Sequence, residues 1–309
     1  MNLSTTGLVL ASDAAVDLHL HTTYSDGTWT PEQLLETLVR EQFGLVAITD
    51  HDRVDTAAAL QQLALDKRQP VLVAVEMTTC WQDESTALRR DKLSGLPEMT
   101  ELLCFGFDPE RNALNDLAQD LLRRQRENSR EVYENLRRNG YAFSQDPDEL
   151  TTLLEKPSPL QPHELVALLK RHGYGTGQPS AGRIVLEAGC AFAMNDTAAV
   201  AEAAHQSGAV CLLAHPGHKD GWVTYDVPLL DKLRQEVPID GLEVYHPVHM
   251  PEQTAMYLEY AQQHHLLISS GSDSHRPDKP PIKYPAELSR TLLERVGIQI
   301  KQQAHEESL

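Results

Sequence analysis

The amino-acid sequence predicts an α/β fold, because strand-like and helix-like segments alternate along both outer parts of the chain. Over the first hundred residues, strands expected at 16–21, 45–49 and 71–75 alternate with helices expected at 31–43 and 56–66. This repetition is typical of parallel strands in an α/β barrel or an open sheet. With 309 residues, 41% of them hydrophobic, the chain can bury one large α/β domain that carries an insertion.

The first strand–helix unit has clear boundary signals. Segment 16–21 alternates apolar and polar residues, as a strand does. A helix start follows it, with Thr30 at the N-cap, Pro31 in the first turn and Gln33 placed for a capping box. Apolar residues then recur at helical spacing until Gly44, which ends the helix.

The middle of the chain has a different composition, rich in charge and in helical period. Helices are expected at 114–138, 162–172 and 183–188, with prolines 147, 157 and 159 between the first two and Pro162 at the start of the second. We interpret this region as a helical insertion. The predicted parts are therefore a first α/β part at 1–108, the insertion at 109–195 and a second α/β part at 196–309.

The alternation of strands and helices returns after the insertion. A helix is expected from 196 to 206, followed by strands at 209–214 and 241–245. A helix at 252–265 then leads into a last strand at 266–270. The pattern of the first hundred residues therefore resumes.

The strong negative charge limits the partners that the protein can bind. A net charge of −18 argues against binding along an extended stretch of duplex DNA, because such binding requires a basic surface that displaces counterions. A small phosphorylated substrate, or the end of a short single strand, remains compatible if metal ions supply positive charge locally. The charge itself mostly reports solubility.

Cysteine usage and hydropathy favour a cytoplasmic protein. The four cysteines are far apart and include no C-x-x-C pair, so a disulfide framework is not expected. No Lys or Arg precedes Arg40, so the basic start of a signal peptide is missing, and no apolar run reaches the length of a membrane span. We expect no membrane partner and no obligate protein partner.

Residues that commonly bind metals stand at the ends of the predicted strands, the edge where sites form in parallel α/β folds. In segment 16–21, the two-residue period puts Asp17, His19 and His21 on one face, and Asp26 follows in the next turn. Two adjacent imidazoles on a strand can chelate one ion. Taken alone, however, H-x-H fits an exposed edge strand with chance histidines at least as well.

The same arrangement recurs along the chain, which changes this balance. His51 follows the second strand, Glu76 ends the third, and His215 follows a strand after the insertion. Asp273 and His275 follow the last strand. Because burying uncompensated charge is costly, five such strand ends favour bound metal over structural side chains. Imidazole and oxygen ligands without thiolates suit Mn²⁺, Mg²⁺, Fe²⁺ or Zn²⁺.

Together these motifs resemble the PHP (polymerase and histidinol phosphatase) family. In order, they are H-x-H with a downstream S-D-G, then T-D-H-D, a Glu after the third strand, A-H-P-G and a closing G-S-D-S-H. The resemblance implies a distorted (β/α)₇ barrel that binds two or three divalent ions, with Glu76 bridging two of them. The implied ligands are His19, His21, Asp26, His51, Glu76, His215, Asp273 and His275.

The resemblance also implies a substrate class. Segment 240–246 and the later His249 resemble the stand-alone phosphoesterases of the family, which act on nucleoside 3′,5′-bisphosphates and on RNA 5′ ends. The expected reaction is in-line attack on phosphorus by a hydroxide held between the ions. We expect Arg183, His246 and His249 to contact the substrate, with Arg183 and His218 taking part in catalysis and His218 protonating the leaving group.

Two positions depart from the family motifs. Glu101 stands where the family often has a His, and a carboxylate there is still a candidate ligand that favours harder ions. A G-R-P-H-x-x-R segment reads Gly177-Gln178-Pro179-Ser180-Ala181-Gly182-Arg183, so only its second Arg is present. We therefore expect weaker selection for a second phosphate. Lys219 is better explained as a solvated surface residue than as a phosphate ligand.

Two other classes of function remain open from the sequence. One is a histidinol-phosphate-type phosphatase of small molecules on the same barrel. The other is a non-catalytic, metal-binding regulatory module, which the near-complete set of ligands disfavours.

Overall fold

A computed structural model describes residues 5–81, 98–143, 148–219 and 221–301. One large sheet forms its centre, with strands in the order β10-β2-β3-β4-β5-β7-β8-β9, and β6 pairs with β4. Its strands are β2 (Ala15–Leu20), β3 (Leu45–Ile48), β4 (Val71–Cys80), β5 (Thr100–Phe105), β6 (Asn195–Asp196), β7 (Val210–Leu213), β8 (Gly241–Tyr245), β9 (Leu267–Ser270) and β10 (Tyr284–Pro285). A separate parallel pair joins β1 (Val9–Ala11) to β11 (Gln299–Lys301).

The sheet is nearly closed, because the segment after β9 returns to β2. The backbone N–H of His21 donates to the carbonyl of Ser274 at 3.0 Å, and that of Asp273 donates to the carbonyl of His19 at 2.9 Å. The predicted α/β class and distorted barrel are thus confirmed. The closure also brings the first and last polar motifs of the chain together.

The barrel is not uniformly parallel. β5 runs antiparallel to both of its neighbours, β4 and β7. No strand was predicted at 100–105, because Thr100 and Glu101 interrupt the apolar pattern at its start, although the whole segment is buried. Within this strand Glu101 pairs with Thr78 of β4, which places its carboxylate at the same end of the barrel as Glu76.

Alternating side chains of the strands enter different apolar clusters. Leu72 and Val73 are adjacent on β4, yet Leu72 joins Phe105 and Leu292 in one cluster, whereas Val73 joins Leu102 in another. This division follows from the two-residue period of a strand. Both faces of β4 are therefore buried, and the barrel provides a rigid support for the polar residues at its end.

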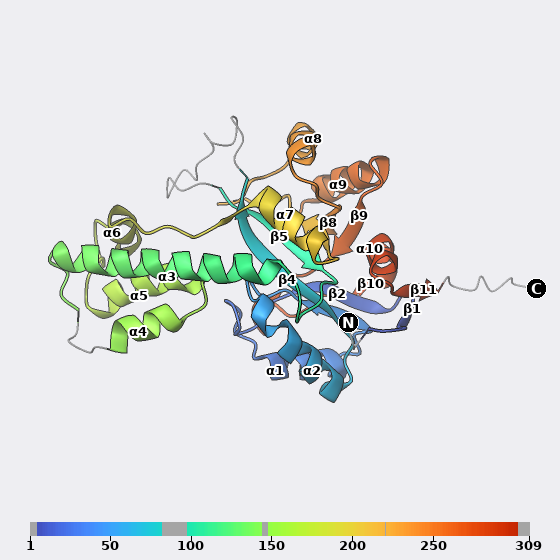
Figure 1. The fold of residues 1–309 in the computed structure, drawn as a ribbon, viewed down its shortest axis with the longest axis horizontal. Helices are drawn as coiled ribbons and strands as arrows, with labels where there is room; N and C mark the ends of the chain where they lie inside the picture. The colour runs from blue at the N-terminus through green and yellow to red at the C-terminus, as the bar shows by residue number, and fades with distance from the viewer. Residues whose placement is uncertain (1–4, 82–97, 144–147, 220, 302–309) are drawn as a thin grey trace, which may run out of the picture.

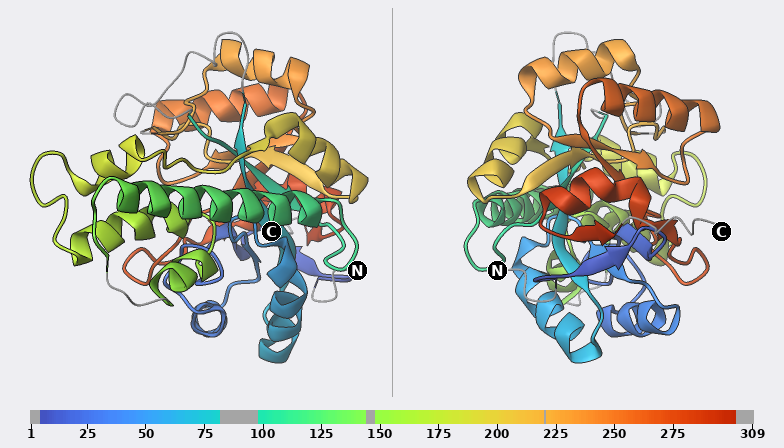
Figure 2. Two further views of the ribbon diagram at one scale, coloured as in Figure 1. Left: turned by 60° about the vertical axis from the view of Figure 1, so that its left-hand side comes forward. Right: turned by 90° about the vertical axis from the view of Figure 1, so that its right-hand side faces the viewer.

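Six described helices lie around the barrel (Figures 1 and 2). They are α1 (Pro31–Arg40), α2 (Ala57–Lys67), α7 (Thr197–Gln206), α8 (Val227–Glu236), α9 (Pro251–Gln263) and α10 (Arg290–Arg295). The predicted capping box of α1 is confirmed, with reciprocal 3.2 Å hydrogen bonds between Thr30 and Gln33. Helices α8 and α10 were not predicted. No helix in the described ranges is both long and apolar enough to cross a membrane.

The remaining helices project from one side of the barrel (Figure 1). They are α3 (Leu114–Arg138), α4 (Asp148–Glu155), α5 (Leu160–Arg171) and α6 (Ala181–Glu187). α3 has the bounds that the sequence predicts, α5 and α6 lie within two residues of theirs, and α4 was missed among the prolines. Leu136, Leu165 and Ile184 contribute to an apolar cluster within this projection. The proposed part boundaries after 108 and 195 stay a prediction.

Candidate metal centre

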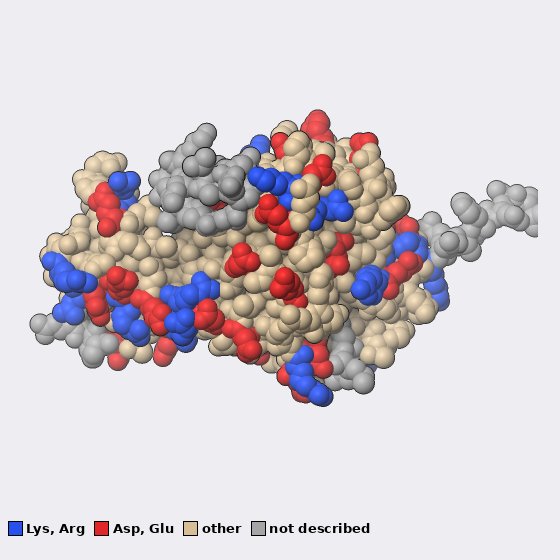
Figure 3. All heavy atoms as spheres, turned by 45° about the horizontal axis from the view of Figure 1, so that its top comes forward, with Lys and Arg blue, Asp and Glu red and all other residues tan. Residues whose placement is uncertain are grey.

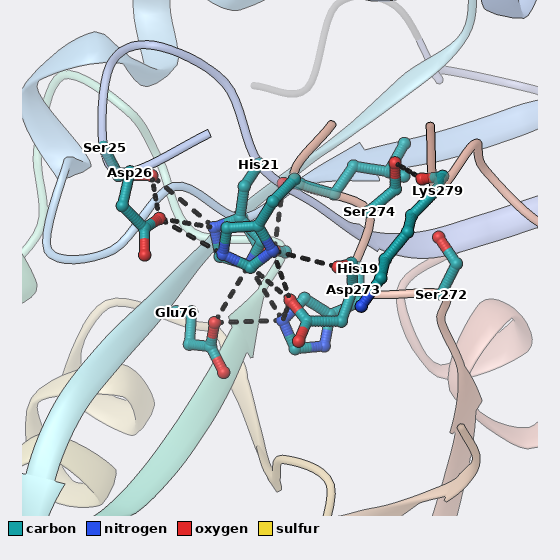
Figure 4. A network of polar contacts seen from close by, with 12 residues as sticks. His19, His21, Ser25, Asp26, Glu76, Ser272, Asp273, Ser274 and Lys279 are labelled. Carbon is teal, nitrogen blue, oxygen red and sulfur yellow. Dashed lines mark hydrogen bonds and ion pairs between the residues drawn. The ribbon is translucent and has the colours of Figure 1, made fainter. Parts of the chain in front are cut away.

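The nine predicted metal ligands come together at one end of the barrel, and Figure 4 shows several of them. Nε2 of His19 lies 2.9 Å from Oε2 of Glu76 and 3.1 Å from Nε2 of His21. The same nitrogen of His21 lies 3.0 Å from Oδ1 of Asp273. These two imidazoles and two carboxylates therefore direct their ligand atoms at one small volume.

Glu76 links this group to a second one beside it. Its Oε1 lies 3.2 Å from Nε2 of His215, which is also 3.3 Å from Oε2 of Glu101. Nδ1 of His51 lies 3.5 Å from Oε2 of Glu76 and 3.6 Å from Oε1 of Glu101. Because its two oxygens face different sets of ligands, Glu76 has the position of a bridging carboxylate.

A third group surrounds Asp26, which the turn after β2 supplies. Its Oδ1 lies 3.2 Å from Nε2 of His275, and its Oδ2 lies 3.9 Å from Nε2 of His51. The ligand atoms of His21, Asp26, His51 and His275 all lie within 4.8 Å of one another. The nine residues thus form three overlapping groups that share His21, His51 and Glu76.

Hydrogen bonds fix the tautomers of two of these histidines. Nδ1 of His275 donates to the carbonyl of Asp273 at 2.9 Å, and Nδ1 of His19 lies 3.0 Å from Oε1 of Glu243. With a proton held on Nδ1, each imidazole directs Nε2 at the cluster, and this nitrogen can bind a metal once it has no proton.

Glu243 was missed as a site residue by the sequence analysis. It is fully buried on β8, and its second oxygen accepts the backbone N–H of His215 at 2.8 Å. The signal that could have found it is a carboxylate between Leu242 and Val244 in a buried strand, because such a charge requires a partner.

Strong electrostatic interactions join the imidazoles and carboxylates of the cluster. Burial lowers the pKa of His21, but hydrogen bonds to Asp273 and Glu76 outweigh it and raise the pKa to about 10. Burial opposes ionisation of Glu76 as well, yet the neighbouring histidines, His19 foremost, hold its pKa well below the usual range. The negative carboxylates therefore require positive charge beside them, which protonated imidazoles or a bound cation can supply.

An unsatisfied atom supports the same conclusion. Among the described residues, Nδ1 of His51 is buried and has no hydrogen-bond partner. Asp273 has a φ of +54° and His215 a φ of +23°, conformations that non-glycine residues rarely adopt and that are common at functional sites. A divalent cation would satisfy such a ligand atom, so the residues present fit a metal centre.

Two further carboxylates hold the loops around the ligands, and neither was predicted to be a ligand. Asp50 accepts hydrogen bonds from the backbone and hydroxyl of Thr22 and from the hydroxyl of Ser25, at 2.6–2.7 Å. It thereby orders the turn that carries Asp26. Asp17 is buried and accepts the backbone N–H groups of residues 272 and 282, both at 2.9 Å.

Glu101 has a further contact that the sequence did not indicate. The indole Nε1 of Trp222 donates to its Oε2 at 2.5 Å. This bond orients the carboxylate so that Oε1 faces His51. Glu101 therefore stays a candidate ligand, and a neighbouring donor holds its carboxylate in place.

Two predicted substrate residues have different hydrogen-bonding states. Nδ1 of His246 accepts the backbone N–H of Val248 at 3.2 Å, so its proton lies on Nε2, which is buried, unpartnered and 3.9 Å from Oδ2 of Asp273. Burial lowers the pKa of His246 to about 3. His249 differs, because its Nδ1 contacts the carbonyl of Val244 and its Nε2 accepts the N–H of Gly217. His246 therefore has a free N–H donor, whereas both ring nitrogens of His249 contact backbone groups.

His218 and Arg183, the predicted catalytic residues, lie in different regions. The His218 ring packs on Trp222 and contacts the edge of His215, and its Nδ1 donates to the carbonyl of Lys219 at 2.6 Å. Burial lowers the pKa of His218. Arg183 is exposed on α6, in the helical projection, and pairs with Glu187 at 2.7 Å. Within the described residues, no contact joins Arg183 to the cluster.

Comparison with known proteins gives three consistent findings. The 5′-3′ exoribonuclease Rnm of Salmonella typhimurium is 26% identical over 84% of this chain and 85% of that protein. The 3′,5′-nucleoside bisphosphate phosphatase of Chromobacterium violaceum is 25% identical over 88% of this chain and 95% of that protein. A solved structure from Bifidobacterium adolescentis, described as a metal-dependent phosphoesterase, superposes with a TM-score of 0.66 at 22% identity, covering 94% of this chain and 97% of the other.

The family model of the PHP domain matches residues 17–175, just over half of the chain. The chain therefore belongs to the PHP family, as its motifs predict, and is a metal-dependent phosphoesterase, a hydrolase of phosphate esters.

Proposed function

We propose that this PHP-family enzyme hydrolyses phosphate esters of nucleotides, as a phosphatase of nucleoside 3′,5′-bisphosphates or as an exonuclease on short 5′-phosphorylated RNA. The observation that carries the proposal is the convergence of nine ligands around the shared carboxylate of Glu76. The curated relatives support the substrate class, because they are an exoribonuclease and a nucleoside bisphosphate phosphatase.

Two or three divalent ions would occupy the three ligand groups. Such ions polarise phosphoryl oxygens and lower the pKa of coordinated water, which supplies the nucleophile. Imidazole and carboxylate ligands without thiolates support Mn²⁺, Zn²⁺, Fe²⁺ or Mg²⁺. At the position of Glu101, a carboxylate in place of an imidazole favours the harder ions among these.

The protein's own groups would orient the phosphate and move protons. Nε2–H of His246 is the free donor for a phosphoryl oxygen beside Asp273. His218, at the edge of the cluster, is the candidate donor to the leaving oxygen. Because its pKa is lowered in the free enzyme, we propose that it takes up its proton when the negative phosphate binds, since an opposite charge nearby favours the imidazolium.

The surface supports a small substrate rather than a duplex. On the face in Figure 3, Lys and Arg side chains stand among Asp and Glu and form no continuous basic track over the described residues. With a net charge of −18, counterion release would contribute little to binding along a duplex. Mononucleotides and short single-stranded ends are therefore the better candidates.

A substrate panel with metal analysis tests the proposal. We expect more than one Mn²⁺ per chain, and kcat/KM highest for nucleoside 3′,5′-bisphosphates or 5′-phosphorylated oligoribonucleotides rather than histidinol phosphate or an aryl phosphate. Asp273→Ala should abolish turnover, while Glu252→Gln on the exposed surface of α9 should not change it. Preference for histidinol phosphate would overturn the nucleotide assignment. Absence of any hydrolysis with Mn²⁺ would favour a non-catalytic metal-binding module.

A further inference from the structure

The loop that follows His275 is anchored to the barrel on both sides of Lys279. The hydroxyl of Ser274 donates to the carbonyl of Lys279 at 2.6 Å, and the backbone N–H of Lys279 donates to the carbonyl of Arg276 at 3.0 Å. Farther along, the N–H of Ile282 donates to the buried carboxylate of Asp17. The backbone of Lys279 is therefore held at a fixed distance from the metal ligands Asp273 and His275.

The side chain of Lys279 runs from this loop back toward the cluster. In Figure 4 its ammonium group points toward Asp273, which is a member of the first ligand group. The side chain is exposed, so it can move to meet a ligand.

Lys279 differs from its cationic neighbours in having no ion-pair partner. Arg276 pairs with Asp278 at 3.3 Å, and Lys283 pairs with Glu41 at 3.5 Å. Across the ranges that the structure describes, no carboxylate oxygen lies within 4.0 Å of the Lys279 ammonium. An unpaired cation beside a carboxylate-rich centre, in a chain of net charge −18, is available for an anionic ligand.

We infer that Lys279 binds a non-bridging oxygen of the substrate phosphate, in addition to the Nε2–H donor proposed for His246. This inference rests on the proposed function and assigns to Lys279 the phosphate contact that the sequence analysis expected from Arg183. Arg183 is bound to Glu187 on α6, and the segment before it lacks the expected Arg and His. Lysine suits this role, because its ammonium is a compact point charge on a flexible stem and is a common phosphate ligand.

Replacement of Lys279 by Met keeps the apolar stem and removes the charge. We expect Lys279→Met to weaken the binding of inorganic phosphate to the Mn²⁺-loaded protein roughly tenfold or more, as measured by calorimetry, because a charged hydrogen bond is lost. The kcat/KM for phosphoesters should fall by a similar factor, and Lys279→Arg should retain most of both. The Mn²⁺ content should stay at the wild-type value. Lys283→Met, an exposed lysine of the same loop, is the matched control and should change neither property.

The outcomes separate this inference from the function on which it rests. Phosphate affinity within twofold of wild type in Lys279→Met would overturn the role of Lys279, whatever the enzyme hydrolyses. A loss of Mn²⁺ that accompanies the loss of phosphate binding would also overturn it, because the residue would then support the metal site. If wild type hydrolyses none of the phosphoesters, the proposed function fails, and the phosphate titration still decides whether Lys279 binds the anion.

Discussion

Replacing Glu243 by Gln tests whether the carboxylate behind the histidines prepares them for metal. Glu243 accepts from two groups at once, facing Nδ1 of His19 at 3.0 Å and the backbone N–H of His215 at 2.8 Å. Gln has nearly the same volume but only one acceptor oxygen. One of the two N–H groups would therefore face an amide N–H instead of an acceptor.

The expected cost follows from these two contacts. Losing one hydrogen bond to a charged acceptor costs about 1.5–3 kcal/mol. Substitution of a residue that orients a metal ligand typically lowers metal affinity about 10–100-fold, which corresponds to about 1.4–2.8 kcal/mol. Both estimates give a loss of about 2 kcal/mol in the free energy of Mn²⁺ binding. Glu243→Gln should therefore weaken Mn²⁺ binding roughly 30-fold without lowering the number of ions bound at saturation.

Competition between the protein and a fluorescent chelator for Mn²⁺ measures this affinity directly. Glu252→Gln, at an exposed position of α9, is the control for the loss of one negative charge and should bind as wild type does. Affinity within twofold of wild type would refute the positioning role of Glu243. Loss of one whole equivalent of metal would also refute it, because Glu243 would then itself be a ligand, together with His19 and His246.

Three other predictions concern the same cluster. Glu101→His should change metal preference or raise occupancy, while Glu101→Gln should lower turnover and be partly rescued by excess Mn²⁺; wild-type metal content and rate in both would make Glu101 a bystander. The raised pKa of His21 stabilises the metal-free fold fully below pH about 6.5, and this contribution is lost as the pH rises through about 10. The Tm of the EDTA-treated protein should therefore fall over that range more than that of the loaded protein, and Mn²⁺ binding at pH 8 should release protons in calorimetry; no release would contradict the assignment. In Gly271→Ala, the new Cβ would lie 2.2 Å from Cβ of His19 and 2.6 Å from Oε1 of Glu243, so the Tm and Mn²⁺ affinity should both fall, and unchanged values would show that this contact relaxes freely.

The convergence of the ligands was predictable because their motifs lie next to elements that are easy to recognise. His19 and His21 share a face through the two-residue period of β2. His51 and Asp273 lie just beyond the carboxyl ends of β3 and β9, whereas Glu76, which was predicted to end its strand, lies within β4, which continues to Cys80. In a barrel of mostly parallel strands these ends meet at one edge, so a pattern that is local in sequence becomes a cluster in space.

Strand β5 escaped this reasoning for a physical reason. Its first residues, Thr100 and Glu101, are polar, and burial of Glu101 is tolerable only because His215 and Trp222 surround it. Neither partner is near in sequence. A prediction from local hydrophobicity therefore misses such a strand, because tertiary contacts satisfy its buried polar residue.

The sequence by itself determined the α/β class, the order of the strand-end motifs and the identity of the candidate ligands, since each depends on residues within a few positions of one another. Only the tertiary structure decided the state and direction of the groups around them. Glu243 reaches His19 across 224 residues of chain, and a backbone N–H sets the tautomer of His246. The tertiary structure also distinguishes two cationic side chains. Arg183 forms an ion pair with Glu187 on α6, whereas Lys279 points toward Asp273. The sequence shows which side chains carry a charge. The closure of the barrel determines which partners, if any, those side chains contact.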